Sequence, residues 1–199
     1  MIYPKLLEKE ISYFQKLPGI GEKSAERLAL SMLDFSAEET NEFAEILKQA
    51  KNKLQKCIIC GHISDAEICS ICDDANRNKN LICVLEDYKS VFAFEKAGEY
   101  SGTYHILGGL ISPIDDIGPE DINISSLTTR VEKLKNPELI VALKSTMEGE
   151  TTTLYIKKIF DEKNIEISRL SYGIPMGAEI DYLDALTLGR ALTDRKKIS

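Results

Sequence analysis

Four of the chain's five cysteines fall in two pairs, Cys57-x2-Cys60 and Cys69-x2-Cys72, which eight residues separate. Each Cys-x-x-Cys pair can present two thiolates to one ion, and four thiolates complete the tetrahedral coordination that zinc prefers. Because protein would then fill all four positions, no position remains for an activated water. We therefore expect a single structural zinc ion, with two redox-active pairs as the alternative.

A proline and two glycines interrupt the helical pattern near the N-terminus. Gly19 and Gly21 carry no side chain, so a phosphate can approach the backbone N–H groups that also begin the next helix. Lys23 and Arg27 lie four residues apart, on one face of that helix, and can reach neighbouring phosphates. Such contacts position a nucleic acid without reading its bases. The alternative is an ordinary turn in which the two cations pair with the glutamates that flank them.

A carboxylate follows the apolar run Leu81–Leu85, which is typical of a strand buried on both faces. Glu86 therefore stands at the usual ligand edge of an open α/β sheet. This stretch resembles a Toprim domain, whose active members bind Mg²⁺ through that glutamate and an Asp-x-Asp pair on a later strand. Here the later strand runs into Lys144-Ser145-Thr146, and a cation at Lys144 should repel Mg²⁺. We expect no catalysis, with a Mg²⁺ enzyme that uses Glu86 and Glu148 as the alternative.

The elements that position these residues follow from the apolar periodicity. Before the first cysteine it predicts helices at 5–17, 22–33 and 37–55, the last opened by a capping box of Ser36 and Glu39. One face of this third helix is apolar and carries Phe43, Ile46, Leu47, Ala50 and Leu54. Farther along, strands at 81–85, 103–107, 138–143 and 166–170 alternate with helices at 89–97, near 125–135, at 150–162 and at 181–192. This alternation predicts an α/β fold with a mainly parallel sheet.

Charge is unevenly distributed along the chain. The total is 25 Lys and Arg against 32 Asp and Glu, a net charge of −7, whereas residues 1–56 hold nine of each sign. This balance argues against a general nucleic-acid polycation and places any DNA contact in the N-terminal part. No apolar run approaches the ~20 residues of a membrane span. The first residues lack a signal-peptide pattern, so we expect a cytoplasmic protein that binds no membrane.

Seven stretches, taken together in chain order, resemble the RecR family of recombination mediator proteins over essentially the whole chain. They are Leu17–Ala25, the four-cysteine segment, Leu81–Glu86, Leu107–Pro113, Ile117–Asp121, Met147–Thr152 and Gly173–Glu179. The resemblance implies a helix-hairpin-helix module at 1–56, a four-cysteine zinc finger at 57–72, a Toprim domain at 80–172, and a C-terminal segment at 173–199 that packs on the Toprim domain and assists oligomerisation.

The resemblance also implies a function in recombinational DNA repair. Members of the family act with RecO and RecF to load recombinase at single-stranded gaps, and form a ring-shaped homotetramer around DNA. It assigns contact with single-stranded, double-stranded or gapped DNA to the four hairpin residues, and contact with RecO to Glu86 and Glu148. The chain departs from the family pattern at Ser90, Lys144-Ser145 and Ala178, where an aspartate, Asn-Pro and a second glycine are usual. A zinc-stabilised adaptor that binds only protein is a further alternative.

Overall fold

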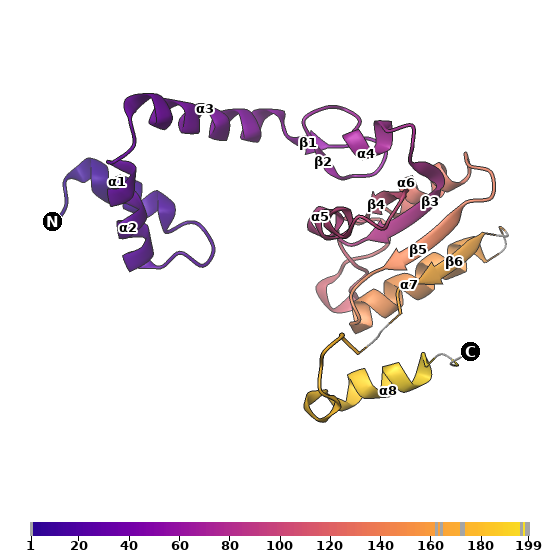
Figure 1. Cartoon of the computed structure of the whole chain (residues 1–199). Coiled ribbons are helices and arrows are strands. Elements are labelled where there is room, and N and C mark those ends of the chain that lie inside the picture. The colour runs from indigo at the N-terminus through magenta and orange to yellow at the C-terminus, as the bar shows by residue number, and fades with distance from the viewer. Residues whose placement is uncertain (1, 162, 164, 172–173, 196, 198–199) are drawn as a thin grey trace. The chain divides into compact units, whose positions relative to one another are not determined.

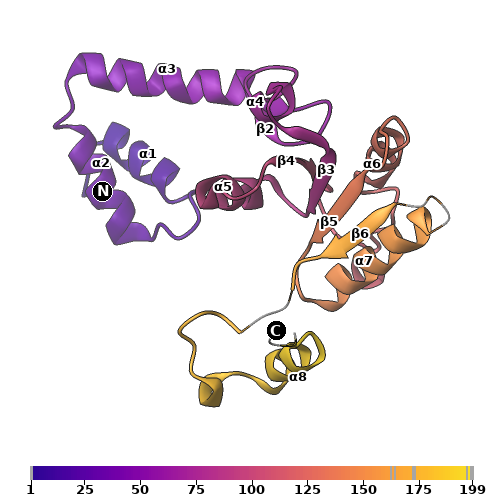
Figure 2. The same ribbon diagram turned by 45° about the vertical axis from the view of Figure 1, so that its right-hand side comes forward.

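Two units make up the fold, Met1–Leu54 and Gln55–Ser199. The computed structural model describes residues 2–161, 163, 165–171, 174–195 and 197. Figure 1 and Figure 2 show the elements of each unit in two views. Within the described residues, none of the helices combines the length and the hydropathy that crossing a bilayer requires.

The first unit consists of the helices α1 (Lys5–Phe14), α2 (Glu22–Met32) and α3 (Ala37–Lys53). The helices α1 and α2 pack together through the buried side chains of Ile11, Ala25 and Ala29. The prediction that the first helix reaches residue 17 was wrong. After Phe14 the chain forms a tighter turn, in which the N–H of Leu17 donates to the Phe14 carbonyl three residues back. Pro18 explains the change, because proline disfavours helical conformation in the residue before it.

The third helix begins with the predicted capping box. The Ser36 Oγ accepts from the Glu39 N–H at 3.1 Å, and the Glu39 carboxylate accepts from the Ser36 N–H at 2.8 Å. Two backbone donors that would otherwise lack partners are thereby satisfied. Four of the apolar side chains on the predicted face are exposed in this structure: Phe43, Ile46, Leu47 and Leu54.

The cysteine pairs lie on a small substructure that opens the second unit. It consists of β1 (Gln55–Lys56), β2 (Ile63–Ser64) and α4 (Ser70–Asp73), with β1 and β2 antiparallel. These elements were not predicted, because each is too short to display the periodic patterns that identify helices and strands.

The remainder of the second unit is built on a parallel four-stranded sheet in the order β4-β3-β5-β6. The strands are β3 (Asn78–Leu85), β4 (Gly102–Ile106), β5 (Glu138–Ala142) and β6 (Glu166–Arg169), and the crossover helices are α5 (Tyr88–Ala97), α6 (Ile124–Val131) and α7 (Met147–Phe160). The predicted α/β class and parallel sheet are confirmed. Both views show α5 on one side of the sheet and α7 on the other (Figure 1, Figure 2).

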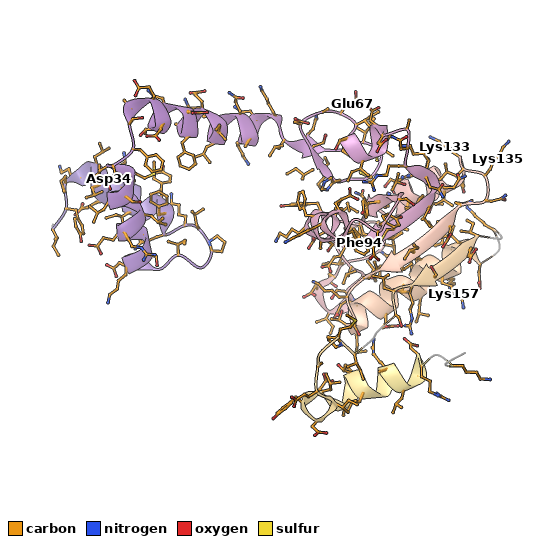
Figure 3. The ribbon with its side chains drawn as sticks, viewed as in Figure 1. Asp34, Glu67, Phe94, Lys133, Lys135 and Lys157 are labelled. Atoms are coloured by element: carbon orange, nitrogen blue, oxygen red, sulfur yellow. The ribbon has the colours of Figure 1, made fainter. Side chains whose placement is uncertain are left out.

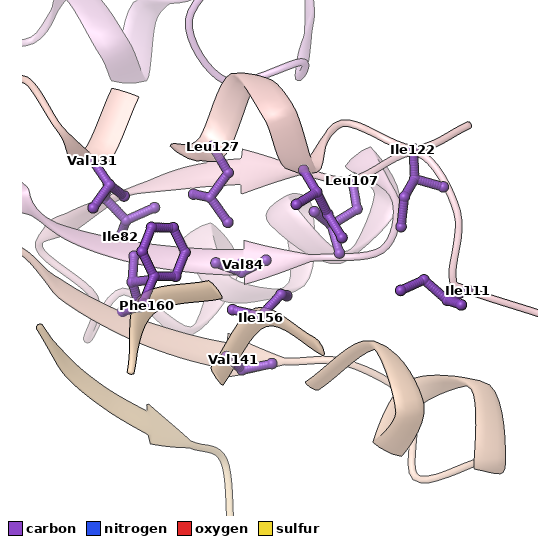
Figure 4. Close-up of a cluster of buried hydrophobic side chains, with 12 residues drawn as sticks. Ile82, Val84, Leu107, Ile111, Ile122, Leu127, Val131, Val141, Ile156 and Phe160 are labelled. Atoms are coloured by element: carbon purple, nitrogen blue, oxygen red, sulfur yellow. The ribbon is translucent and has the colours of Figure 1, made fainter. Parts of the chain in front are cut away.

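Apolar side chains fill both faces of this sheet. On one face, residues of β3 and β5 meet α6 and α7 in a cluster that includes Ile82, Leu127 and Phe160 (Figure 4). On the other face, Cys83 and Leu85 of β3 pack with Val91 of α5. The strand β3 is therefore covered on both sides, as its continuous apolar run predicted.

Several helix boundaries differ from the predicted ones. The helix α7 begins at Met147 rather than at 150, because the Thr146 side chain caps it by accepting from the Gly149 N–H at 3.3 Å. Its predicted end, residue 162, lies outside the described residues. The helix α6 ends four residues early, in a tight turn. The predicted helix 181–192 is a 3-10 turn, η2 (Ile180–Tyr182), followed by α8 (Ala185–Thr193), since Asp184 caps α8 through the Thr187 N–H.

Candidate functional site

The four paired cysteines meet in one place. The Sγ atoms of Cys57, Cys60, Cys69 and Cys72 all lie within 4.8 Å of one another, and all four residues are buried. Two amides point at the sulfurs, with the His62 N–H 3.4 Å from the Cys60 Sγ and the Cys69 N–H 3.3 Å from the Cys57 Sγ. Such N–H groups stabilise thiolates, which are the form that binds metal.

The electrostatics of this thiol cluster match a bound cation. Hydrogen bonds from Cys60 and Cys72 hold the pKa of the Cys69 thiol far below its usual range. The bond to Cys69 in turn raises the pKa of the Cys60 thiol. Without a metal, Cys69 is therefore favoured as a thiolate while Cys60 is favoured as a thiol. A divalent cation among the sulfurs would favour the thiolate at all four. The donor set therefore fits one tetrahedral zinc ion.

The cysteine substructure is joined to the sheet by backbone hydrogen bonds. The Ile106 N–H, at the end of β4, donates to the Cys60 carbonyl at 2.7 Å. Gly61 has a φ of +75° there, and a Cβ on it would lie 3.2 Å from the Ile106 carbonyl oxygen. Just beyond β4, the Gly108 N–H donates to the Glu86 carbonyl at 2.8 Å. These hydrogen bonds therefore fix the end of β4 relative to the cysteine cluster on one side and to the backbone of Glu86 on the other.

The hairpin between α1 and α2 has the predicted open backbone. Gly19 has a φ of +82°, and a Cβ at either Gly19 or Gly21 would meet no atom within 4 Å. Gly21 is the N-cap of α2 and supplies no side-chain cap, so the first N–H groups of α2 remain available to an anion. Lys23 and Arg27 are exposed.

The alternative pairing of these two cations with neighbouring glutamates is not observed. Neither Lys23 nor Arg27 takes part in any ion pair among the described residues. Of the flanking glutamates, Glu26 instead accepts a hydrogen bond from the Tyr3 hydroxyl. The two cationic side chains are thus left to solvent or to a ligand.

At the C-terminal edge of the sheet, the ammonium group of Lys144 forms an ion pair with Glu86, the first of the Toprim carboxylates. Glu86 follows β3, Lys144 follows the adjacent β5, and the Lys144 Nζ lies 2.8 Å from the Glu86 Oε1. This hydrogen bond and the glutamate's charge raise the pKa of Lys144. Glu148 lies nearby in the first turn of α7, where its own N–H and the Thr146 hydroxyl lower its pKa. Both predicted partner-binding carboxylates therefore flank Lys144.

Other carboxylates at this edge already have structural partners. Asp87 caps α5 by accepting from the N–H groups of Lys89 and Ser90. Glu150 receives the guanidinium groups of Arg169 and Arg190, at 3.4 and 3.0 Å. Among the described residues, the four cysteines are the only group of three or more acidic, histidine or cysteine side chains close enough to share an ion. The edge thus lacks the converging carboxylates that two-metal chemistry requires.

Comparison with known proteins covers nearly the whole chain. Residues 7–51 match the RecR helix-hairpin-helix model, 54–74 the RecR four-cysteine zinc finger model, 80–171 the Toprim domain model and 173–196 the RecR C-terminal model. Proteins named Recombination protein RecR from Staphylococcus aureus strains Mu3, Mu50 and MRSA252 are each 44% identical over 198 residues, which covers 100% of both chains. The chain belongs to the RecR family.

Membership of the RecR family agrees with the predicted zinc site. The zinc finger match spans all four clustered cysteines, so the chain carries a zinc finger with room for one ion. The fifth cysteine, Cys83, lies in β3 outside the cluster, and burial raises the pKa of its thiol to about 12. His62 is buried with its ring 5.2 Å from that of Phe92, and it is not part of the thiol cluster.

The C-terminal segment of this RecR-family chain makes contacts through residues that the sequence did not single out. Arg190 of α8 bonds to the Ser145 hydroxyl at 2.6 Å and to Glu150, while Asp194 lies 3.4 Å from Arg169. These charges come from three parts of the chain, 19 or more residues apart, and no periodicity in the sequence marks them.

Replacing Cys57 and Cys60 together with serine should remove the zinc ion. We expect about one zinc per chain in the unaltered protein and close to none in the variant, because two of four thiolates are lost. Elemental analysis of dialysed protein by mass spectrometry measures this content. The control is Cys83→Ala, which should keep its zinc. Equal zinc in the double variant, or its loss from Cys83→Ala, would contradict the assignment.

Proposed function

We propose that this RecR-family protein is a DNA-binding mediator of recombinational repair that acts without catalysis. With RecO and RecF it promotes recombinase loading at single-stranded gaps in the cytoplasm. The observation that carries the proposal is the hairpin, where uncapped N–H groups of α2 lie beside two cations without ion-pair partners in the described structure. Four parts of the chain contribute to this function, namely the hairpin module at 1–56, the zinc finger at 57–72, the Toprim domain at 80–172 and the C-terminal segment at 173–199.

In this proposal, DNA phosphates bind at Gly19, Gly21, Lys23 and Arg27. The glycines leave room for a phosphate at the start of α2, where the helix dipole favours an anion. The two exposed cations then contact neighbouring phosphates. Because phosphates carry no base information, binding is independent of sequence, and the same contacts serve single-stranded, double-stranded and gapped DNA.

Binding without catalysis is supported by the state of the Toprim edge. Lys144 places its positive charge against Glu86, while Asp87 and Glu150 are committed to α5 and to two arginines. A magnesium ion there would have to displace an ammonium group and break a helix cap. We therefore propose that the edge binds protein rather than metal, with RecO contacting Glu86 and Glu148, and the pKa of Glu148 is lowered by its own N–H and the Thr146 hydroxyl.

Exposed apolar surface supports assembly into a ring-shaped homotetramer. On α3 the side chains of Phe43, Ile46 and Leu47 are 41%, 55% and 56% exposed, and on α8 Leu186 and Leu192 are 64% and 65% exposed. Soluble monomers seldom leave such apolar faces open. Each subunit of a closed ring contacts two neighbours. Since the two apolar faces lie on different helices, a ring can use one face for each neighbour.

Reversing both hairpin charges tests the DNA contact. In Lys23→Glu plus Arg27→Glu we expect affinity for gapped DNA to fall by more than about tenfold, because two phosphate contacts become repulsive. The slope of log affinity against log salt should become shallower by about two. Fluorescence anisotropy with labelled DNA at several salt concentrations measures both.

The matched control for this test is Lys51→Glu plus Lys53→Glu, which makes the same charge change on exposed lysines of the same unit. It should bind DNA nearly as well as the unaltered protein, and zinc content should be equal in all three. Undiminished DNA binding by the hairpin variant would remove the assignment and favour an adaptor that binds only protein.

Neutralising the acidic edge tests the partner surface. We expect Glu86→Gln plus Glu148→Gln to weaken binding to purified RecO by about tenfold, because charge-assisted contacts at an interface are lost. Glu138→Gln plus Glu166→Gln serves as the control, since these residues begin β5 and β6 at the opposite edge of the sheet. Isothermal titration calorimetry compares the pairs. RecO binding that is unchanged in the first pair would rule out this surface.

A further inference from the structure

A cavity of about 660 Å³ lies between the zinc finger and the helix α6. The zinc finger contributes Ile58, Ile59 and the zinc ligand Cys72, the strands β3 and β4 contribute Lys79 and Thr103, and the α6 side contributes Ser125, Ser126, Thr129, Arg130, Lys133 and Leu134. We call this set of residues the knuckle groove. Ile58 is 65% exposed, although isoleucine is among the residue types most often buried. None of these residues belongs to the hairpin or to the acidic edge.

The side chains around the knuckle groove carry more positive than negative charge, and the zinc-binding thiolate of Cys72 is the one anionic group among the described residues that line it. Lys79, Arg130 and Lys133 line the cavity, and no carboxylate among the described residues lines it, although the whole chain carries a charge of −7. Among the described residues, half-buried Arg130 donates only to neutral groups, the Tyr104 carbonyl at 2.6 Å and the Thr103 hydroxyl at 2.7 Å. A partly buried guanidinium bonded only to neutral groups favours an anion nearby, and its remaining N–H groups suit a carboxylate.

The cationic potential of the groove reaches the side chain behind it. His105 is buried and bonds to the Asn123 carbonyl through Nε2 at 2.9 Å. Burial, opposed by the Asn123 bond and aided by the charge of Arg130, lowers the pKa of His105 to about 4. His105 is therefore neutral at physiological pH and adds no charge beside Arg130.

The apolar part of the groove indicates what kind of anion fits. Its apolar contacts come from the aliphatic side chains of Ile58, Ile59 and Leu134, and no aromatic residue in the described part of the chain lines the cavity. Surfaces that bind single-stranded nucleic acid usually stack bases on aromatic rings, which this groove lacks. An aliphatic floor beside a cationic rim matches a peptide that carries both apolar and acidic side chains.

We propose that the knuckle groove binds a short acidic peptide segment of a partner protein. An apolar side chain of the peptide packs against Ile58, Ile59 and Leu134, and its carboxylates bond to Arg130 and Lys133. This site is separate from the DNA contact and from the acidic edge, so it adds a second protein-binding surface of opposite charge to the one at Glu86.

The test uses the full-length, zinc-loaded protein and a panel of short fluorescein-labelled peptides. Each peptide places one leucine or phenylalanine among aspartates and glutamates, and a matched panel replaces these acids with asparagine and glutamine. Anisotropy measures affinity, while methyl NMR of labelled isoleucines reports on Ile58 and Ile59. We expect acidic peptides to bind, to shift both methyl signals, and to bind at least about tenfold more tightly than their neutral analogues.

Two exposed lysines provide matched variants, both labelled in Figure 3. Lys133 lines the groove and Lys157 lies on α7 outside it. Lys133→Glu should weaken peptide binding by about tenfold, and Lys157→Glu should leave it within about twofold. Ile58→Glu should also weaken it, through the apolar floor. DNA binding by the hairpin should be equal in all three variants, which keeps this test independent of the proposed function.

The following results would overturn the proposal. They are the absence of binding by any acidic peptide, equal binding by acidic and neutral panels, equal losses in the two lysine variants, and a change of oligomeric state in Lys133→Glu or Ile58→Glu, which would make the groove a contact between copies of the chain. Displacement of bound peptide by oligothymidylate, with oligothymidylate affinity lost in Lys133→Glu, would instead make it a nucleic-acid site and equally reject the peptide.

Discussion

The burial of four thiols within 4.8 Å of one another is the constraint on which the second unit depends. So many sulfurs cannot all ionise in contact unless a cation lies among them. A zinc ion removes that repulsion and fixes a segment whose strands are two residues long. From there, the hydrogen bond between the Ile106 N–H and the Cys60 carbonyl fixes the end of β4, and the Gly108 N–H fixes the backbone of Glu86. The metal site thereby helps to position the acidic edge of the sheet.

The two units differ in how their charges are used. In the first unit, Lys23 and Arg27 form no ion pair within the described structure, although as many acids as bases surround them in residues 1–56. In the second unit, Glu86 and Glu150 have cationic partners and Asp87 caps a helix. The proposed function follows this contrast, since free cations suit phosphates, whereas carboxylates already engaged by protein groups are poorly placed to bind magnesium.

Features with a short sequence signature could be predicted, and those made by distant residues could not. The cysteine spacing, the capping box at Ser36 and the apolar run of β3 each identify a structure locally, and the structure contains all three. The helix α1 ends before its predicted boundary because Pro18 disfavours helical conformation in the residue that precedes it. The contact of Arg190 with Glu150 joins residues 40 apart, and the cavity beside Arg130 depends on a zinc finger whose strands no periodicity reveals. The proposed partners and assembly rest on the family resemblance, because no pattern in the residues indicates them.

The claim that this Toprim edge binds rather than cuts is tested most directly on gapped DNA. End-labelled gapped DNA is incubated with the protein and Mg²⁺ or Mn²⁺, and the same samples are run on native and denaturing gels. We predict a shifted band on the native gel and full-length strands on the denaturing gel. Metal-dependent cleavage that disappears in Glu86→Ala would contradict the account and show that Lys144 gives way to a catalytic metal ion.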